Sequence, residues 1–173
     1  MSAVLHWAPL GPDDFAAWRA ESVTGYAEGK VQAGNWPAEG AIERSEAEFA
    51  SLLPQGADTP QHHLGRLLRD DATPIGIAWL RIAPAHDGAG AETLAYLFDF
   101  VIDPAWRGKG LGRAAMAAVE AKALALGAKR LSLHVFAHNI AACRLYEAAG
   151  FVITNLNMSK PLAAGAESAT SLT

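Results

Sequence analysis

The sequence predicts a single α/β domain, in which a mixed sheet is combined with helices. Strand-like segments and segments with helical spacing of apolar residues succeed one another along the chain. The chain has 173 residues, enough for one domain with a substantial core. Neither an internal repeat nor a low-complexity linker divides it. We therefore expect one domain over residues 1–161 and a flexible tail at 162–173, where nearly all residues are small or polar.

Composition and charge exclude several classes of protein. Hydrophobic residues make up 51% of the chain and the net charge is −4, which excludes a disordered chain and a nucleic-acid binder that relies on bulk charge. The single cysteine, Cys143, excludes an internal disulfide framework. The first residues lack a basic signal-peptide region, and no apolar run approaches the roughly 20 residues of a membrane span. We expect a cytoplasmic protein that binds neither nucleic acid nor membrane.

The N-terminal third predicts one strand and two helices. Residues 4–10 form a strand candidate that ends at a Gly-Pro pair. Asp13 then caps a predicted helix, which the stretch "NWPAEG" terminates. A second helix follows Pro37, with apolar residues on one side and glutamates on the other. Residues 53–60 are rich in Pro, Gly and Asp, which is typical of a loop.

The middle of the chain predicts three successive strands. The stretches "HHLGRLLRD" (62–70) and "PIGIAWLRIA" (74–83) are joined at an Asp-Asp pair. A turn at 85–92, "AHDGAGAE", leads into the long apolar strand "TLAYLFDFVID" (93–103).

The C-terminal third alternates helix and strand. Residues 113–126 are rich in alanine and carry apolar residues at three- and four-residue spacing, which predicts a packed helix closed by Gly127. A strand at 130–136, a short helix at 139–149 and a last strand at 151–160 complete the prediction.

A glycine-rich stretch lies between the long strand and the alanine-rich helix. It consists of Arg107, Gly108, Lys109, Gly110, Leu111, Gly112 and Arg113. Its spacing fits neither a Walker loop nor a dinucleotide fingerprint. Glycines can still turn backbone N–H groups inward, and a following helix N-terminus and three cations favour an anion. A pyrophosphate is the predicted ligand, and a plain connecting turn is the alternative.

The pattern Arg-x-x-Gly-x-Gly (107–112), after a long strand and before an alanine-rich helix, resembles the pyrophosphate loop of the GNAT superfamily of N-acetyltransferases. The continuation "LSLHVFAHNIAACRLYEAAGF" is similar to that superfamily's next strand and helix. The resemblance extends from about Tyr96 to Val152. It implies a mixed, mostly antiparallel sheet, split near its middle, with helices on both faces.

The resemblance also implies acetyl-CoA as acyl donor, with no metal. Backbone groups of Phe100, Val101 and Ile102 would pair with the pantetheine arm as an added strand. Residues 108–113 would surround the pyrophosphate, and Asn139 would bind the pantetheine while capping its helix. The N–H of Val101 would also donate to the developing oxyanion. The acceptor would be a primary amine of a small molecule or peptide, chosen by the two N-terminal helices and the loop that follows them.

Acetyl transfer needs a proton acceptor and a proton donor. An alkyl amine with a pKa near 10.4 is neutral in only about one molecule per few thousand at pH 7. Tyr146, two helical turns after Asn139, matches the family's tyrosine that protonates the coenzyme A thiolate. His134 stands where some members carry a catalytic glutamate, and we expect it to be the base. Glu92 and Asp99, acting through water, are the alternatives.

The residues are also compatible, to different degrees, with other functions. A non-catalytic acyl-CoA sensor would keep the loop but needs neither Tyr146 nor a base, and a longer acyl-CoA would suit the same loop. A nucleotide-phosphate enzyme lacks the expected hydroxyl and carboxylates. His62 and His63 are neighbours on a strand, so their rings point to opposite faces and cannot share a metal. Cys143 is expected to be a small packing residue, and a homodimer is possible.

Overall fold

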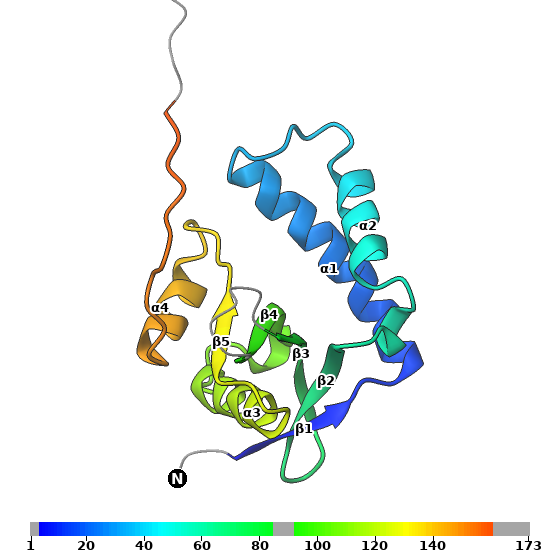
Figure 1. Ribbon diagram of the computed structural model, residues 1–173, viewed down its shortest axis with the longest axis vertical. Helices are drawn as coiled ribbons and strands as arrows, with labels where there is room; N and C mark the ends of the chain where they lie inside the picture. Colours follow the sequence, from blue (N-terminus) through cyan, green and yellow to red (C-terminus); the bar gives the residue numbers. More distant parts are fainter. Residues whose placement is uncertain (1–3, 85–91, 161–173) are drawn as a thin grey trace, which may run out of the picture.

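The computed structural model describes residues 4–84 and 92–160 and shows a mixed α/β fold (Figure 1). Its five strands are β1 (Leu5–Pro9), β2 (His62–Arg69), β3 (Pro74–Pro84), β4 (Thr93–Ile102) and β5 (Arg130–Leu133). Its α-helices are α1 (Pro12–Gln32), α2 (Ala41–Leu52), α3 (Gly112–Ala125) and α4 (Ile140–Ala148), with short 3-10 turns at Gly56–Asp58 and Pro104–Trp106. The turn predicted at 85–92, apart from its last residue, and the tail predicted at 162–173 lie outside the described residues.

The sheet is mostly antiparallel, as predicted. Its strands lie in the order β1-β2-β3-β4-β5, and only the β4–β5 pair is parallel. The turn between β2 and β3 is the predicted Asp-Asp turn: the Thr73 N–H donates to Asp71 Oδ1 at 3.1 Å, and Ala72 has a φ of 62°. Short turns of this kind suit antiparallel neighbours, whereas β5 is reached through helix α3.

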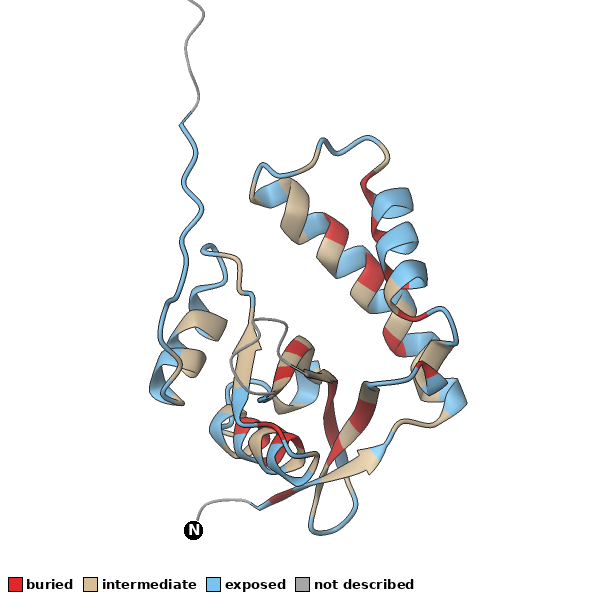
Figure 2. Cartoon of the chain, in the orientation of Figure 1, coloured by how far each residue is buried: buried red, intermediate tan, exposed pale blue. Residues whose placement is uncertain are grey.

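Helices cover both faces of the sheet (Figure 1). Successive side chains of the central strands point to opposite faces, and both sets are apolar. In β3, Ile77 and Trp79 pack with the α1 and α2 side, while Ala78 and Leu80 pack with the α3 side. All four side chains are buried. Figure 2 shows the same pattern, with the buried residues gathered on the central strands and on the helix faces that meet them.

The sheet splits beyond the middle of β4. Trp79 pairs with Asp99 and Leu80 with Leu97, so Phe98 is an extra residue that makes a β-bulge in β4. Pairing with β5 extends only from Leu94 to Leu97. The second half of β4 is therefore not paired with β5, and this is the split that the resemblance implied.

Of two predicted helix boundaries, the start of α1 differs from the prediction and the end of α3 agrees with it. The N-cap of α1 is Gly11, not Asp13, because Pro12 occupies the first helical position, where its fixed φ and missing N–H suit the helix start. Asp13 instead lies in the first turn, where its charge suits the helix dipole. At the end of α3, Gly127 has a φ of 87° and closes the helix as predicted.

The C-terminal prediction is wrong in two respects. Residues 151–160 form no strand and have no regular secondary structure. In addition, β5 ends at Leu133, three residues before the predicted end. The apolar alternation of 151–160 indicates a strand, yet pairing needs a neighbouring edge, and in this chain the segment does not lie against one.

Candidate active site

A cavity of about 320 Å³ opens at the end of β4, beyond its pairing with β5. One wall is the end of β4 with the glycine loop, and the other is helix α4. The lining residues are Phe100, Ile102, Trp106, Arg107, Gly108, Gly110, Leu111, Gly112, Asn139, Ala141, Ala142, Leu145 and Tyr146. The structure thus brings together most of the residues that the sequence assigned to acyl-donor binding, although about 40 residues separate the two walls along the chain.

The glycine loop has the backbone that its sequence predicts. Gly108 and Gly110 have φ values of 70° and 74°, in the left-handed region that favours glycine. No side chain caps α3, and its first backbone bond runs from the Ala115 N–H to the Leu111 carbonyl at 2.9 Å. The three N–H groups before Ala115 are therefore without a backbone acceptor in the described part of the chain. Such donors at a helix N-terminus fit a phosphate group.

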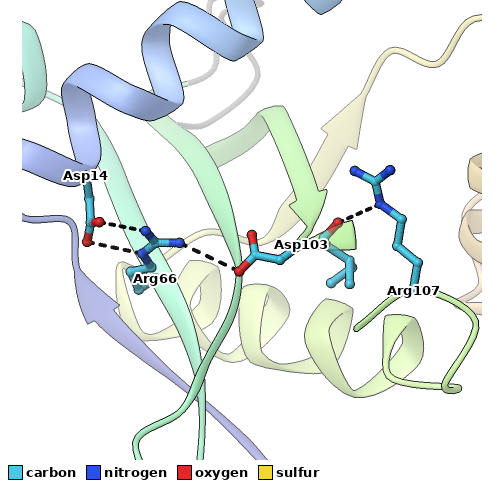
Figure 3. A network of polar contacts seen from close by, with 5 residues as sticks. Asp14, Arg66, Asp103 and Arg107 are labelled. Carbon is cyan, nitrogen blue, oxygen red and sulfur yellow. Dashed lines mark hydrogen bonds and ion pairs between the residues drawn. The ribbon is translucent and has the colours of Figure 1, made fainter. Parts of the chain in front are cut away.

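The three cations of the loop have different surroundings. Arg107 Nε donates to the Ile102 carbonyl at 2.8 Å, which ties the loop to the end of β4 (Figure 3). Lys109 Nζ lies 4.7 Å from the centre of the Trp106 ring. Arg113 is exposed, and together with Lys109 it borders a second depression of about 940 Å³ beside α3. Lys109 and Arg113 therefore lie outside the first cavity, and so does Val101.

An ion-pair network behind the loop was missed by sequence reasoning. Arg66 on β2 forms a bidentate pair with Asp14 on α1, at 2.6 and 3.1 Å, and its Nη1 lies 3.8 Å from Asp103 Oδ2 (Figure 3). The Arg66 guanidinium lowers the pKa of Asp14. The available signal was an arginine between the apolar residues of β2, and its partners come from distant segments.

Helix α4 places Asn139 and Tyr146 on one wall of the cavity. Asn139 is the N-cap, and its Oδ1 accepts from the Ala142 N–H at 3.2 Å. Burial raises the pKa of Tyr146 to about 12, with a smaller contribution from the negative charge of Asp99. The Tyr146 hydroxyl therefore stays protonated at neutral pH and can donate a hydrogen.

Asp99 lies at the bulge of β4 and joins α1 to the sheet. Its Oδ2 accepts from Trp18 Nε1 at 2.7 Å and from Ser22 Oγ at 2.8 Å. Its Oδ1 accepts from the Phe100 N–H at 2.9 Å. The resemblance assigned backbone groups of Phe100 to the pantetheine, but the N–H of Phe100 is already hydrogen-bonded to Asp99. Burial raises the pKa of Asp99, against the three hydrogen bonds, which lower it.

His134 follows β5 and is exposed. Its ring meets Phe136 edge-to-face at 5.1 Å, and it makes no hydrogen bond to a described residue. Partial desolvation lowers its pKa, and the charge of Lys30 on α1 lowers it further. The imidazole is therefore neutral at pH 7, although His134 does not line the cavity. Glu92 is exposed before β4 begins, roughly 20 Å or more from the bulge along the strand.

An aromatic contact joins α1 to the segment after β5, and sequence reasoning did not foresee it. Phe136 lies 6.4 Å from Tyr26 and stacks on His138 at 5.3 Å. A Cβ on Gly29 would lie 2.6 Å from the Phe136 ring, so this close approach needs glycine. A glycine inside a helical pattern is the signal that could have indicated the contact. The contact places α1 beside His134.

The other candidates have structural surroundings. His62 Nδ1 accepts from Trp79 Nε1 at 2.8 Å, and burial lowers the pKa of His62 to about 4. Burial and, to a smaller extent, the charge of Lys122 on α3 lower the pKa of His63. The two rings lie on opposite faces as predicted, since His62 meets Trp79 and His63 lies toward α3. Cys143 is partly exposed. Within residues 4–84 and 92–160, no group of His, Cys, Asp and Glu could hold a metal ion, and no helix could span a membrane.

The comparisons with known proteins decide the family. Residues 30–151 match the acetyltransferase (GNAT) family, which is more than half of the chain. The chain belongs to the GNAT acetyltransferase family. Members of this family are enzymes that use acetyl-CoA or CoA, and the matched region includes both walls of the cavity. The protein is accordingly an N-acetyltransferase.

Two curated relatives from Bacillus subtilis (strain 168) support the assignment to the GNAT family. The uncharacterized N-acetyltransferase YycN is 39% identical over 154 residues, covering 89% of this chain and 96% of the relative. The uncharacterized N-acetyltransferase YdgE is 35% identical over 150 residues, covering 87% and 93%. A crystal structure of YycN superposes with a TM-score of 0.86 at 37% identity, covering 93% of this chain and 100% of that chain.

Proposed function

We propose that this GNAT enzyme transfers an acetyl group from acetyl-CoA to a primary amine of a small molecule or peptide, by direct attack in a ternary complex. The observation that carries the proposal is the cavity at the split of the sheet, with loop N–H donors on one wall and Asn139 and Tyr146 on the other. A binder of phosphate alone would not need a protonated tyrosine on the opposite wall.

The loop residues would hold the donor. Gly108 to Arg113 direct N–H groups toward the pyrophosphate, and the N-terminus of α3 favours its negative charge. Lys109 and Arg113, beside the neighbouring depression, add positive charge next to that site. Asn139 and the carbonyl groups of Phe100 and Ile102 would orient the pantetheine arm, which acetyl-CoA supplies together with the reactive thioester.

The reaction would then need two proton transfers. The amine nitrogen bonds to the acetyl carbon as the carbon–sulfur bond breaks. Val101 pairs with Ile77 of β3 and does not line the cavity, so we do not assign its N–H to the developing oxyanion. The Tyr146 hydroxyl donates its proton to the leaving sulfur, and its raised pKa keeps that proton available. His134, neutral at pH 7, accepts the proton from the amine directly or through one water.

Asp99 is less suited to be the base, because both of its oxygens already accept hydrogen bonds. Glu92 precedes β4 and lies too far from the bulge, along the length of the strand, to reach the amine. We assign Asp99 to holding the bulge and α1 in place.

The test is an acetyl-CoA turnover assay that follows thiol release against a panel of amines: peptide N-termini, lysine, polyamines and amino acids. We expect thiol release with at least one class of amine. Tight binding of acetyl-CoA without release for any amine would contradict the proposal and favour a sensor. Faster thiol release from a longer acyl-CoA would instead identify that acyl-CoA, and not acetyl-CoA, as the donor.

A further inference from the structure

Residues 152–160, the C-terminal segment, are exposed and include four large apolar side chains. Val152, Ile153, Leu156 and Met158 have exposed fractions of 81%, 69%, 73% and 93%. Figure 1 shows the segment leaving the end of α4 and running away from the body of the protein, and Figure 2 shows it as exposed. After Phe151, its backbone makes no hydrogen bond to any described residue. Apolar side chains concentrated in this way are typical of a surface that is buried on association.

β5 presents the complementary feature, an open sheet edge. It is the last strand of the sheet and pairs with β4 along one side only, within the part of the chain that the structure describes. No residue of β5 or of α4 is buried, although Leu131, Leu133 and Tyr146 touch the main core. An open edge carries N–H and C=O groups that can pair with another strand.

The sequence of the segment suits a strand with one face covered. Because side chains alternate along a strand, Val152, Leu156 and Met158 would share one face with Thr154. The opposite face would carry Ile153 and two asparagines. The first face is the one expected to pack against the partly exposed apolar residues near β5.

We propose that residues 152–158 pair with the open edge of β5 in a second copy of this chain, in a reciprocal exchange that forms a dimer. The segment is tethered to its own α4, where the Phe151 N–H donates to the Tyr146 carbonyl at 3.0 Å. From there, a turn at Gly150 (φ 93°) sends it away from its own sheet. A two-fold exchange closes both open edges with the same contact, which is a low-cost route to a dimer.

The exchange would bear on the active site. β5 leads directly into His134, and α4 carries Asn139 and Tyr146. Neither β5 nor α4 has a buried residue, so a strand from the partner would add packing behind them.

The first experiment measures the mass of the full chain by light scattering on a sizing column. We expect a dimer for the wild type and a monomer for Leu156→Asp, because the new charge lies on the packing face. Asn157→Asp, which adds the same charge on the opposite face one residue later, should remain a dimer. A monomeric wild type, or the same mass for both variants, would overturn the proposal.

A second experiment locates the segment. In a Cys143→Ser background, one tagged chain carries Arg130→Cys at β5 and a second chain carries Asn155→Cys, and the two are co-expressed and treated with a short bismaleimide. We expect a covalent heterodimer, and none when exposed Asn35→Cys replaces Arg130→Cys. A cross-linked monomer from one chain that carries both cysteines would show pairing within the chain. That result, or a dimer without the cross-link, would refute the exchange.

Discussion

Tyr146 combines a protonated hydroxyl with a position on the cavity wall. Tyr146→Phe keeps the ring and its edge contact with Phe151 but removes the proton. We expect kcat to fall by about 10²-fold while the Kd for coenzyme A changes little, since only the transition state uses the proton. Steady-state kinetics and calorimetric titration measure the two quantities. Equal kcat in both proteins would make Tyr146 a packing residue.

His134 should determine the acidic limb of kcat/KM. Its pKa is lowered by partial desolvation and by Lys30, so activity should be lost as the pH falls below the ordinary histidine range, near 6.5, rather than within it. His134→Gln should slow the reaction, most of all where the amine is chiefly protonated, and remove this limb from the pH profile.

His138→Gln is the matched control for His134, because His138 is exposed and stacks on the same Phe136 ring. It should keep the wild-type profile. If the acidic limb survives in a folded His134→Gln protein, as judged by its melting curve, the base lies elsewhere and Asp99 is the next residue to change.

At the scale of elements, the loop before α3 can be tested by a pair of glycines. Gly110 and Gly34 have nearly the same φ, 74° and 71°, and neither has an atom within 4 Å of an added Cβ. Valine at either position should cost about 1–2 kcal/mol of stability from backbone strain. Gly110→Val alone should weaken coenzyme A binding, by about tenfold or more, because it also misdirects the loop N–H groups. Equal affinities would contradict the pyrophosphate assignment.

The contact between α1 and β2 depends on pH. The pKa of Asp14 is lowered in the folded protein, so its pair with Arg66 stabilises the fold above about pH 4. That stability is lost as the pH falls through the lowered pKa. Asp14→Asn should reduce the free energy of unfolding at pH 7 by about 0.5–1 kcal/mol, a modest value because the Asp14 side chain is 43% exposed.

Urea unfolding at pH 7 and pH 3 measures the effect of Asp14. Asp13→Asn is the control, since Asp13 forms no ion pair within the described residues. The difference in the free energy of unfolding between the two variants should be smaller at pH 3 than at pH 7. A difference that is the same at both pH values would mean that the Asp14–Arg66 pair does not contribute.

For the whole molecule, stability is unevenly distributed. The α1–α2–β3 side has a tight aromatic cluster, with Trp18, Phe49 and Trp79 all buried, whereas α4 has no buried residue. We expect amide hydrogen exchange to be fastest in α4 and the loop, and slowest in β3. Coenzyme A should slow exchange in α4 and the loop by about tenfold or more, because it joins the two walls of the cavity, and leave α1 nearly unchanged. Uniform protection by coenzyme A would contradict this division.

The sequence was sufficient for features that depend on local spacing. The apolar periods predicted the order of the helices and of the strands β1 to β5, and the glycines of residues 108–112 predicted a loop between β4 and α3. Asn139 and Tyr146 could be placed on one face because side chains seven residues apart in an α-helix, about two turns, point in the same direction. Local chemistry decides such features, so one short window contains the information.

Tertiary structure alone decided which distant residues meet. Asp14 with Arg66, Trp18 with Asp99 and Gly29 with Phe136 are 52, 81 and 107 positions apart, and no local pattern links the members of these pairs. The same reason explains the error at residues 151–160: alternation shows that a segment can form a strand, while only the fold shows whether an edge is within its reach. Residue types and local periods therefore predicted the parts of the candidate site, and the packing of α1 and α4 around the split sheet determined their arrangement.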